Sequence, residues 1–186
     1  SMTLDGAGYT VSGFGYGDND DSTVLSQILS VFIRKEFIIE DISKCRRALL
    51  HIDYDDGFVA YINGYEIARG NIGTPGIPPA YNQLAGSSSH EAAMYSGGRP
   101  EEFMIDSVFN YLNKGENILA IQVHNLSNGS SDLTALPFFT LGLTVPVQNP
   151  EGISPYLTIQ SQELHTNFKI RSSGESVFLF SKTGIL

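Results

Sequence analysis

The stretch that decides the fold is Ile52 to Ala68, IDYDDGFVAYINGYEIA. It predicts three short strands joined by two tight turns, because Asp56-Gly57 and Asn63-Gly64 are dipeptides that tolerate the positive φ angles of two-residue hairpin turns. The residues between the two turns are β-branched and aromatic types that strands favour. The stretch therefore predicts a β-meander and, with it, an all-β fold.

The composition of the whole chain agrees with this fold class. The chain has 186 residues, with 19 Gly, 9 Tyr and 11 Phe, and it has few long apolar stretches of helical period. This balance is typical of an all-β sandwich or barrel with many turns. A chain of ~150 residues buries roughly two-thirds of its unfolded surface, so one full core and an appendage are expected.

Charge and cysteine content exclude several classes of site and partner. The formal net charge is −9 with only 11 Lys and Arg, which argues against nucleic acid and anionic membranes because phosphate neutralisation requires clustered cations. Neutral ligands or cations fit better. The single cysteine, Cys45, excludes an internal disulfide framework and a Cys-rich zinc site. No run approaches the ~18 apolar residues of a membrane span, so no membrane insertion is expected.

Other strands are predicted on both sides of a long loop. Residues 70–100 contain four Pro, many Gly and Ser and no sustained periodicity, which predicts a loop far longer than the usual ~4–6 residues. The Gly-rich and Asp-rich segment 12–23 is also predicted to be a loop. Strand patterns are found at 31–39 (an edge or half-exposed strand), 48–54, 103–109, 117–124 and 133–145.

The chain is predicted to have two parts. Residues 1–147 would form the β-sandwich, and 148–152 (QNPEG) would form a linker. The tail, 153–186, contains three short strand patterns, which are too few to bury their own core. These strands either pack on the sandwich or begin a second, incomplete β domain, and we prefer the second interpretation.

Several of these segments resemble a known family. GFGYGDNDD (13–21), VFIRKEF (31–37), DYDDGFVAYINGYEIAR (53–69) and LNKGENILAIQVHN (112–125) with SSDL (130–133) resemble galactose-binding-like jelly-roll modules. Such modules occur in large secreted bacterial proteins, next to CotH-type kinase-like domains, lamin-tail domains or glycoside hydrolases. DDGFVAYING and KGENILAIQV also resemble the sugar-binding domain of family 2 glycosidases. Residues 164–184 resemble the opening strands of a lamin-tail-like immunoglobulin domain.

The resemblance implies a galactose-binding-like β-sandwich, or jelly roll, that serves as an accessory module. It implies a bacterial protein that is extracellular, periplasmic or on the cell surface. Many members of this fold bind sugars or a structural calcium at their loops, and many only space other domains. Because fold does not give function, both roles stay open at this point.

Two acidic clusters are candidates for binding Ca²⁺, which takes six to eight oxygen ligands. The first contains Asp18, Asp20 and Asp21. Its alternative interpretation is a solvated loop whose Asp side chains cap local turns. The second contains Asp53, Asp55 and Asp56, and its Asp55-Asp56 pair resembles the Asp pair with which PA14-type lectin domains hold Ca²⁺ beside a sugar. For that pair, hairpin turn chemistry at Asp56-Gly57 is the preferred explanation.

The long loop contains the residues that we predict for ligand binding. Aromatic faces cover the C–H patch of a pyranose ring while polar groups bind its hydroxyls. The predicted set is Arg69, Tyr81, His90, Glu91, Tyr95 and Arg99. Alternatively, Tyr81 and Tyr95 pin the loop onto the sandwich, and the absence of Trp weakens the case for a strong glycan platform.

Catalysis has little support in the sequence. There is no G-x-S-x-G or H-E-x-x-H motif, and the four histidines lack metal-ligand spacing. We therefore expect a non-catalytic module that binds glycans or contacts neighbouring domains of the same polypeptide. The alternatives are a structural or protein-interaction spacer and, with less support, a glycosidase-related enzyme. A pair of convergent carboxylates about 5–10 Å apart in a cleft would favour the enzyme.

Overall fold

The computed structural model describes residues 13–17 and 23–144 in full and, outside them, the backbone of six two-residue strands. The chain divides into two compact units, Ser1–Pro146 and Val147–Leu186, which are described separately. Three antiparallel pairs contain the six short strands: β1 (Thr3–Leu4) with β2 (Thr10–Val11) in the first unit, and β12 (Ile159–Gln160) with β13 (Glu163–Leu164) and β14 (Phe180–Ser181) with β15 (Gly184–Ile185) in the second. Most positions of the predicted tail strands lie outside the described residues, so a lamin-tail-like domain stays a prediction.

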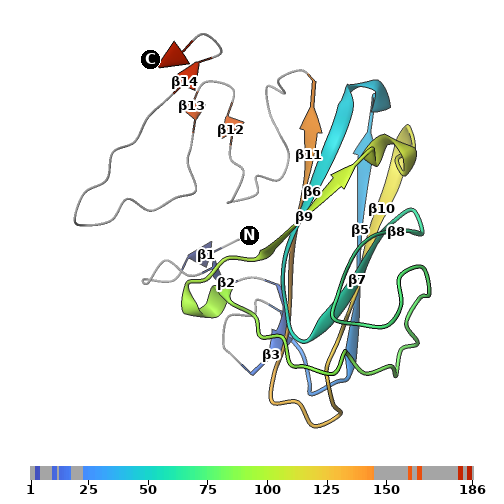
Figure 1. The fold of residues 1–186 in the computed structure, drawn as a ribbon, viewed down its shortest axis with the longest axis vertical. Helices are drawn as coiled ribbons and strands as arrows, with labels where there is room; N and C mark the ends of the chain where they lie inside the picture. Colours follow the sequence, from blue (N-terminus) through green and yellow to red (C-terminus); the bar gives the residue numbers. More distant parts are fainter. Residues whose placement is uncertain are drawn as a thin grey trace. The chain divides into compact units, whose positions relative to one another are not determined.

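The first unit is a β-sandwich of two packed sheets (Figure 1). Its strands are β3 (Phe14–Tyr16), β4 (Thr23–Val24), β5 (Ser30–Ile39), β6 (Cys45–Tyr54), β7 (Gly57–Ile62), β8 (Tyr65–Gly70), β9 (Glu101–Asp106), β10 (Gly115–His124) and β11 (Leu133–Leu143). One sheet has the order β5-β10-β7-β8 and the other has the order β4-β3-β11-β6-β9.

This strand order is that of a jelly roll. If β3 and β5 to β11 are numbered one to eight along the chain, the two sheets read 2-7-4-5 and 1-8-3-6, which is the order that two interlocked Greek keys produce. Strand β4 is an addition that pairs with β3 in parallel. The predicted all-β jelly-roll sandwich is therefore confirmed. No helix in the described part of the chain is long and apolar enough to cross a membrane.

The core lies between the two sheets and is built from alternate residues of the long strands. Each fully buried Leu, Ile, Val or Phe side chain contributes about 1.5–3 kcal/mol. The buried cluster contains Leu50, Ile52 and Tyr54 of β6, Phe58, Ala60 and Ile62 of β7, and Leu119, Ile121 and Val123 of β10. The inward faces that the alternating pattern predicts for β6 and β10 are thus confirmed, and β5 is an edge strand as expected.

Only one of the two predicted hairpin turns is present. Asn63 and Gly64 connect β7 to its partner β8 with φ angles of 51° and 87°, as a two-residue turn with two positive φ angles requires. The turn predicted at Asp56-Gly57 is wrong, because β6 and β7 belong to different sheets. Asp55 and Asp56 instead form a corner at which the chain leaves one sheet and enters the other, so the stretch is not a meander.

Two further predictions need correction or refinement. The segment predicted as a loop at 12–23 contains β3, which pairs with β11. Gly13 and Gly17 flank this strand with φ angles of 90° and 106°, so the chain bends at both of its ends. The predicted strand at 103–109 ends at Asp106 and is followed by the 3-10 turn η3 (Val108–Asn110). The loop after β8 has no strand and only the 3-10 turn η2 (Met94–Ser96); η1 (Ile42–Lys44) precedes β6.

Candidate metal centre

The corner between β6 and β7 is tied to both sheets through its backbone. The N–H of Asp55 donates to the carbonyl of Thr134 in β11 at 3.0 Å, and the N–H of Asp56 donates to the carbonyl of His124 in β10 at 3.1 Å. A Cβ on Gly57 would lie 2.6 Å from the carbonyl oxygen of Asn71. Glycine at this position therefore allows the start of the long loop to approach the corner.

The carboxylate of Asp56 is used in holding two loops. Oδ1 accepts the N–H of His90 at 3.0 Å, and Oδ2 accepts the N–H of Leu126 at 2.7 Å. The first donor belongs to the long loop and the second to the loop between β10 and β11. Charge-assisted bonds of this kind are stronger than neutral ones. Asp56 therefore has a structural explanation, which differs from the predicted hairpin and from metal binding.

The carboxylate of Asp55 lies in a different environment. One oxygen each from Asp55, Glu91 and Asp132 lies within 4.8 Å of the others. Asp55 is 3% exposed, and no amide, hydroxyl or cation in the described part of the chain donates to it; its hydrogen-bonding neighbour is the Asp56 carboxylate. Burial first, and then the charges of Asp56, Asp132 and Glu91, raise the pKa of Asp55 to about 8. The group thus lacks the positive charge that a buried carboxylate needs.

The donor set suits a hard divalent cation. Ca²⁺ takes six to eight oxygens at ~2.3–2.6 Å, with carboxylates binding through one or both oxygens and carbonyls or waters completing the shell. The three carboxylates come from three segments: the corner, the long loop and the loop between β10 and β11. Asn125 also lies beside this corner, because its neighbours His124 and Leu126 both bond Asp56. Its Oδ1 is buried and has no hydrogen-bond partner among the described residues. Oxygen ligands without His or Cys favour Ca²⁺ over zinc.

The predicted metal residues have different outcomes. Asp18, Asp20 and Asp21 lie outside the described residues. Asp55 lies in the acidic centre. Each carboxylate oxygen of the neighbouring Asp56 accepts a backbone N–H, so this side chain has a structural role. Glu91, which we predicted to bind a ligand, also lies in the centre.

Asp132 was missed as a site residue. A signal for it exists in the strand pattern, because β6 pairs antiparallel with β11 and places Tyr54 opposite Ala135. Residues just after β6 and just before β11 must therefore meet at one end of the sheet. The local prediction of a hairpin at Asp56-Gly57 hid this juxtaposition.

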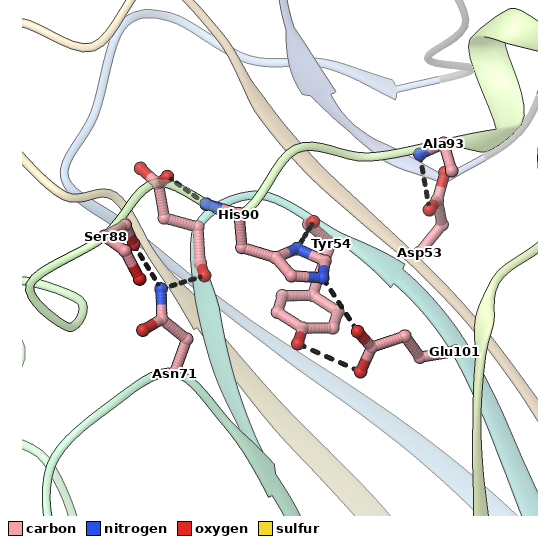
Figure 2. Close-up of polar contacts among 8 residues, drawn as sticks. Asp53, Tyr54, Asn71, Ser88, His90, Ala93 and Glu101 are labelled. Carbon is pink, nitrogen blue, oxygen red and sulfur yellow. Dashed lines mark hydrogen bonds and ion pairs between the residues drawn. The ribbon is translucent and has the colours of Figure 1, made fainter.

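The same end of the sandwich anchors the long loop through a second set of contacts, shown in Figure 2. The His90 ring stacks on the Tyr54 ring with centroids 3.9 Å apart and an interplanar angle of 1°. His90 Nδ1 lies 3.0 Å from the Tyr54 carbonyl, and Nε2 lies 2.9 Å from Glu101 Oε1. The Tyr54 hydroxyl donates to Glu101 Oε2 at 3.1 Å. Burial and then the Glu101 charge raise the pKa of Tyr54, so this hydroxyl stays a donor.

A buried carboxylate on β6 holds the next part of the loop. Asp53 Oδ1 accepts the N–H of Ala93 and Oδ2 accepts that of Met94, both at 2.8 Å. Asn71 Nδ2 donates to the carbonyls of Asp56 and Ser88 at 3.0 and 2.7 Å (Figure 2). The loop is long, but it is held by charged and amide side chains at several points. Its backbone near Glu91 is therefore positioned by the sandwich.

The structure places the residues predicted for ligand binding in several different surroundings, and their role in binding stays a prediction. Arg69 is 8% exposed and binds Glu66 with two nitrogens and the carbonyls of Ile72 and Ile77, so its guanidinium is committed to holding the loop. Tyr81 is 74% exposed, and its carbonyl accepts from Ser30 of the four-stranded sheet.

The other predicted residues lie elsewhere. Tyr95 is 46% exposed and follows Met94, which is bound to the five-stranded sheet. Arg99 is exposed, and His90 is stacked on Tyr54. The two exposed tyrosines of the loop thus lie on segments that are attached to different sheets.

The fold and the acidic centre together define a jelly-roll β-sandwich with a candidate cation site at one end. No family model matches the chain, and no curated protein is similar to it in sequence. Among solved structures, the chain is similar to a β-D-mannosidase from Dictyoglomus thermophilum, with 18% identity and a TM-score of 0.31. The match covers 51% of this chain and 9% of the mannosidase chain. None of these findings connects the chain to CotH-type or lamin-tail proteins, and that resemblance stays a prediction.

Proposed function

We propose that the chain is a non-catalytic β-sandwich module that binds Ca²⁺ at the acidic centre formed by Asp55, Glu91 and Asp132. The observation that carries this proposal is the buried Asp55 carboxylate, which has two further carboxylates within 4.8 Å and, among the described residues, no amide, hydroxyl or cation that donates to it. A bound Ca²⁺ would supply the missing charge. It would also link the corner, the long loop and the loop between β10 and β11.

The acidic centre contains convergent carboxylates, which makes the comparison with a glycosidase necessary. In retaining glycosidases two carboxyl groups lie ~5–5.5 Å apart on either side of a bond in an open cleft. Here Asp55 is buried and three carboxylates point at one another. The surface of the four-stranded sheet has two shallow depressions, and none of the three carboxylates lines either of them. This arrangement supports cation binding better than acid and nucleophile chemistry.

We further propose that the module belongs to a larger exported protein and binds carbohydrate. Support comes from the jelly-roll topology, which many sugar-binding modules share, and from a groove on the four-stranded sheet. A structural spacer without a small ligand is the alternative, and it would need neither the groove nor the acidic centre.

The first test is thermal unfolding in EDTA and then with Ca²⁺ or Mg²⁺ added in excess. Ca²⁺ at a hundredfold its Kd should stabilise the fold by about 2.7 kcal/mol. For a chain of this size that corresponds to a rise in Tm of roughly 5–10 °C. Asp55→Asn and Glu91→Gln should remove most of this rise. Asp106→Asn changes an exposed carboxylate on β9 and should keep it.

Two results would contradict the cation proposal. One is a wild-type Tm that Ca²⁺ does not change, which would favour the spacer. The other is a Ca²⁺ response of equal size in Asp55→Asn, Glu91→Gln and Asp106→Asn, which would place the cation elsewhere on this acidic protein.

A further inference from the structure

The outer face of the four-stranded sheet contains a groove that the sequence did not indicate. On adjacent strands Arg34 of β5 lies opposite Ala120 of β10, and Ala120 lies opposite Tyr61 of β7. Two residues further along the same face of these strands, Phe32 of β5 lies opposite Gln122 of β10. Because the small Ala120 lies between two long side chains, the sheet surface is hollow along this line.

Two depressions that share three lining residues make up the groove. One has a volume of about 260 Å³ and is walled by Pro78 and Pro79 of the long loop; the other has about 350 Å³ and extends past Asn63, Gly64 and Ile118. Both are lined by Arg34, Tyr61 and Ala120. The lining follows β10 from Gln122 to Ile118, and a groove that is elongated along a strand fits a chain-like ligand better than a single compact molecule.

The loop wall of this groove is fixed by contacts already described. Arg69 holds the carbonyls of Ile72 and Ile77, and Ile77 directly precedes Pro78. Ser30 Oγ donates to the carbonyl of Tyr81 at 2.8 Å on the other side of the two prolines. Arg69, which is half-buried and was predicted as a ligand residue, therefore shapes a binding surface without lining it. Binding sites are usually preformed in this way.

The side chains of the groove match the chemistry of a sugar. Phe32 is 57% exposed, and the Tyr61 ring lines both depressions, so both rings can cover the C–H faces of pyranose units. Gln122 Nε2 donates to the Tyr61 hydroxyl at 2.9 Å, which leaves the hydroxyl proton for a ligand oxygen. Arg34 has no ion pair among the described residues, and its guanidinium can donate to hydroxyls or to a sugar carboxylate.

We propose that this groove binds an extended glycan chain, with Tyr61 and Phe32 as stacking surfaces and Arg34 as the main hydrogen-bond donor. The proposal rests on the carbohydrate-binding role proposed above and gives that role a location on the sheet face. It replaces the long-loop surface around Tyr81 and Tyr95 as the expected site.

The test is affinity electrophoresis of the whole chain in native gels that contain one polysaccharide each, with Ca²⁺ present. The probes are a mixed-linkage β-glucan and a β-mannan, which are neutral, and polygalacturonate, which has carboxylates. The variants are Tyr61→Ala and Arg34→Ala, with Tyr81→Ala and Tyr95→Ala as matched controls. The Tm of each variant is measured to show that it folds; Arg34 is exposed, so its replacement leaves the fold intact.

We expect at least one polysaccharide to retard the wild type. Tyr61→Ala and Arg34→Ala should each raise the apparent Kd for that polysaccharide by at least about tenfold. The two controls should stay within about twofold. Retardation by polygalacturonate alone would assign Arg34 to a sugar carboxylate, and retardation by a neutral polymer would assign it to hydroxyls.

The outcomes separate the groove from the carbohydrate role itself. Unchanged binding in Tyr61→Ala and Arg34→Ala, with loss in Tyr81→Ala or Tyr95→Ala, overturns the groove and keeps a glycan-binding module. A wild type that none of the three polymers retards counts against both proposals and favours a spacer.

Discussion

The corner at Asp55–Gly57 and the hairpin at Asn63–Gly64 look alike in the sequence, and the fold uses them in different ways. Each places a turn-forming polar residue before a glycine between two strands. The hairpin joins neighbouring strands of one sheet, and its glycine has open space around it. The corner joins two sheets, and its glycine is packed against the backbone of Asn71.

The difference also concerns the polar side chains. In the hairpin the Asn63 side chain has three partners from a distant part of the chain: its Nδ2 donates to the carbonyl of Tyr111 and to Asn117 Oδ1, and its Oδ1 accepts the N–H of Ile118. At the corner, two carboxylates are buried side by side, and one of them, Asp55, accepts from no donor group within the described part of the chain. The backbone of the hairpin follows the local preference of Asn63-Gly64, whereas the buried corner holds an acid that is either protonated or, as we propose, bound to a cation.

The largest expected effect concerns the polar side chains of the two turns. Asp56→Ala leaves the N–H groups of His90 and Leu126 without an acceptor. Since each buried unsatisfied group costs about 1–3 kcal/mol, the free energy of unfolding should fall by about 4 kcal/mol. Asn63→Ala in the less buried hairpin should cost about 2 kcal/mol. Urea unfolding of both variants measures the difference.

Asp56→Asn keeps one acceptor oxygen, so its free energy of unfolding should lie between those of the wild type and Asp56→Ala. It keeps the comparison measurable if Asp56→Ala does not fold. If Asn63→Ala were less stable than both Asp56→Ala and Asp56→Asn, the expectation that the corner contributes more to stability than the hairpin would be wrong.

The second expected effect concerns the two glycines. A Cβ on Gly57 meets a backbone oxygen at 2.6 Å, so Gly57→Ala forces the chain to shift and should cost about 3 kcal/mol. Gly64→Ala meets nothing within 4 Å, but its φ of +87° should cost about 1–2 kcal/mol. Thermal and urea unfolding should rank them in this order.

Replacement by asparagine separates the two causes. Asn tolerates the left-handed conformation, so Gly64→Asn should be more stable than Gly64→Ala. Gly57→Asn should be no better than Gly57→Ala, because the clash is steric. Recovery at both positions would mean that both glycines serve backbone conformation only.

The comparison also shows which parts of the molecule could be predicted from sequence. The hairpin was predicted correctly because the preference of Asn63-Gly64 for positive φ is local. The strands of the sandwich were found because alternation reports which face of a strand is buried. The corner was missed because β6 and β7 do not pair with each other: β6 pairs with β11 and β9, and β7 pairs with β10 and β8.

For the candidate sites, residue type was a weaker guide than topology. Glu91 and Asp55 were both singled out, but for different sites, and Asp132 was missed. The pairing of β6 with β11 brings Asp132 to Asp55, and the bonds of the long loop to Asp53 and Asp56 bring Glu91 to both. Arg69 has donors that could bind a ligand, yet its guanidinium pairs with Glu66 and holds the backbone of the long loop. Ala120, whose small size creates the groove, has no chemical signal at all.

The smallest and most specific effect is the pH dependence of the metal-free protein. The pKa of Asp55 is about 8 in the folded state against an ordinary 3.8, so folding favours its protonated form. The stability from this group is full below the unfolded value and is lost as pH rises through about 8. In EDTA, the free energy of unfolding should therefore fall by on the order of 1 kcal/mol per pH unit between about pH 6 and 8.

Urea unfolding at several pH values tests this slope against matched variants. Asp55→Asn carries no titrating group and should remove most of the slope, whereas Asn63→Ala at the hairpin should keep the wild-type slope although it is less stable. Because Ca²⁺ competes with protons for the same carboxylate, stabilisation by Ca²⁺ should grow over the same pH range. A slope that Asp55→Asn leaves unchanged would mean that the corner, like the hairpin, is explained by its backbone and needs no cation.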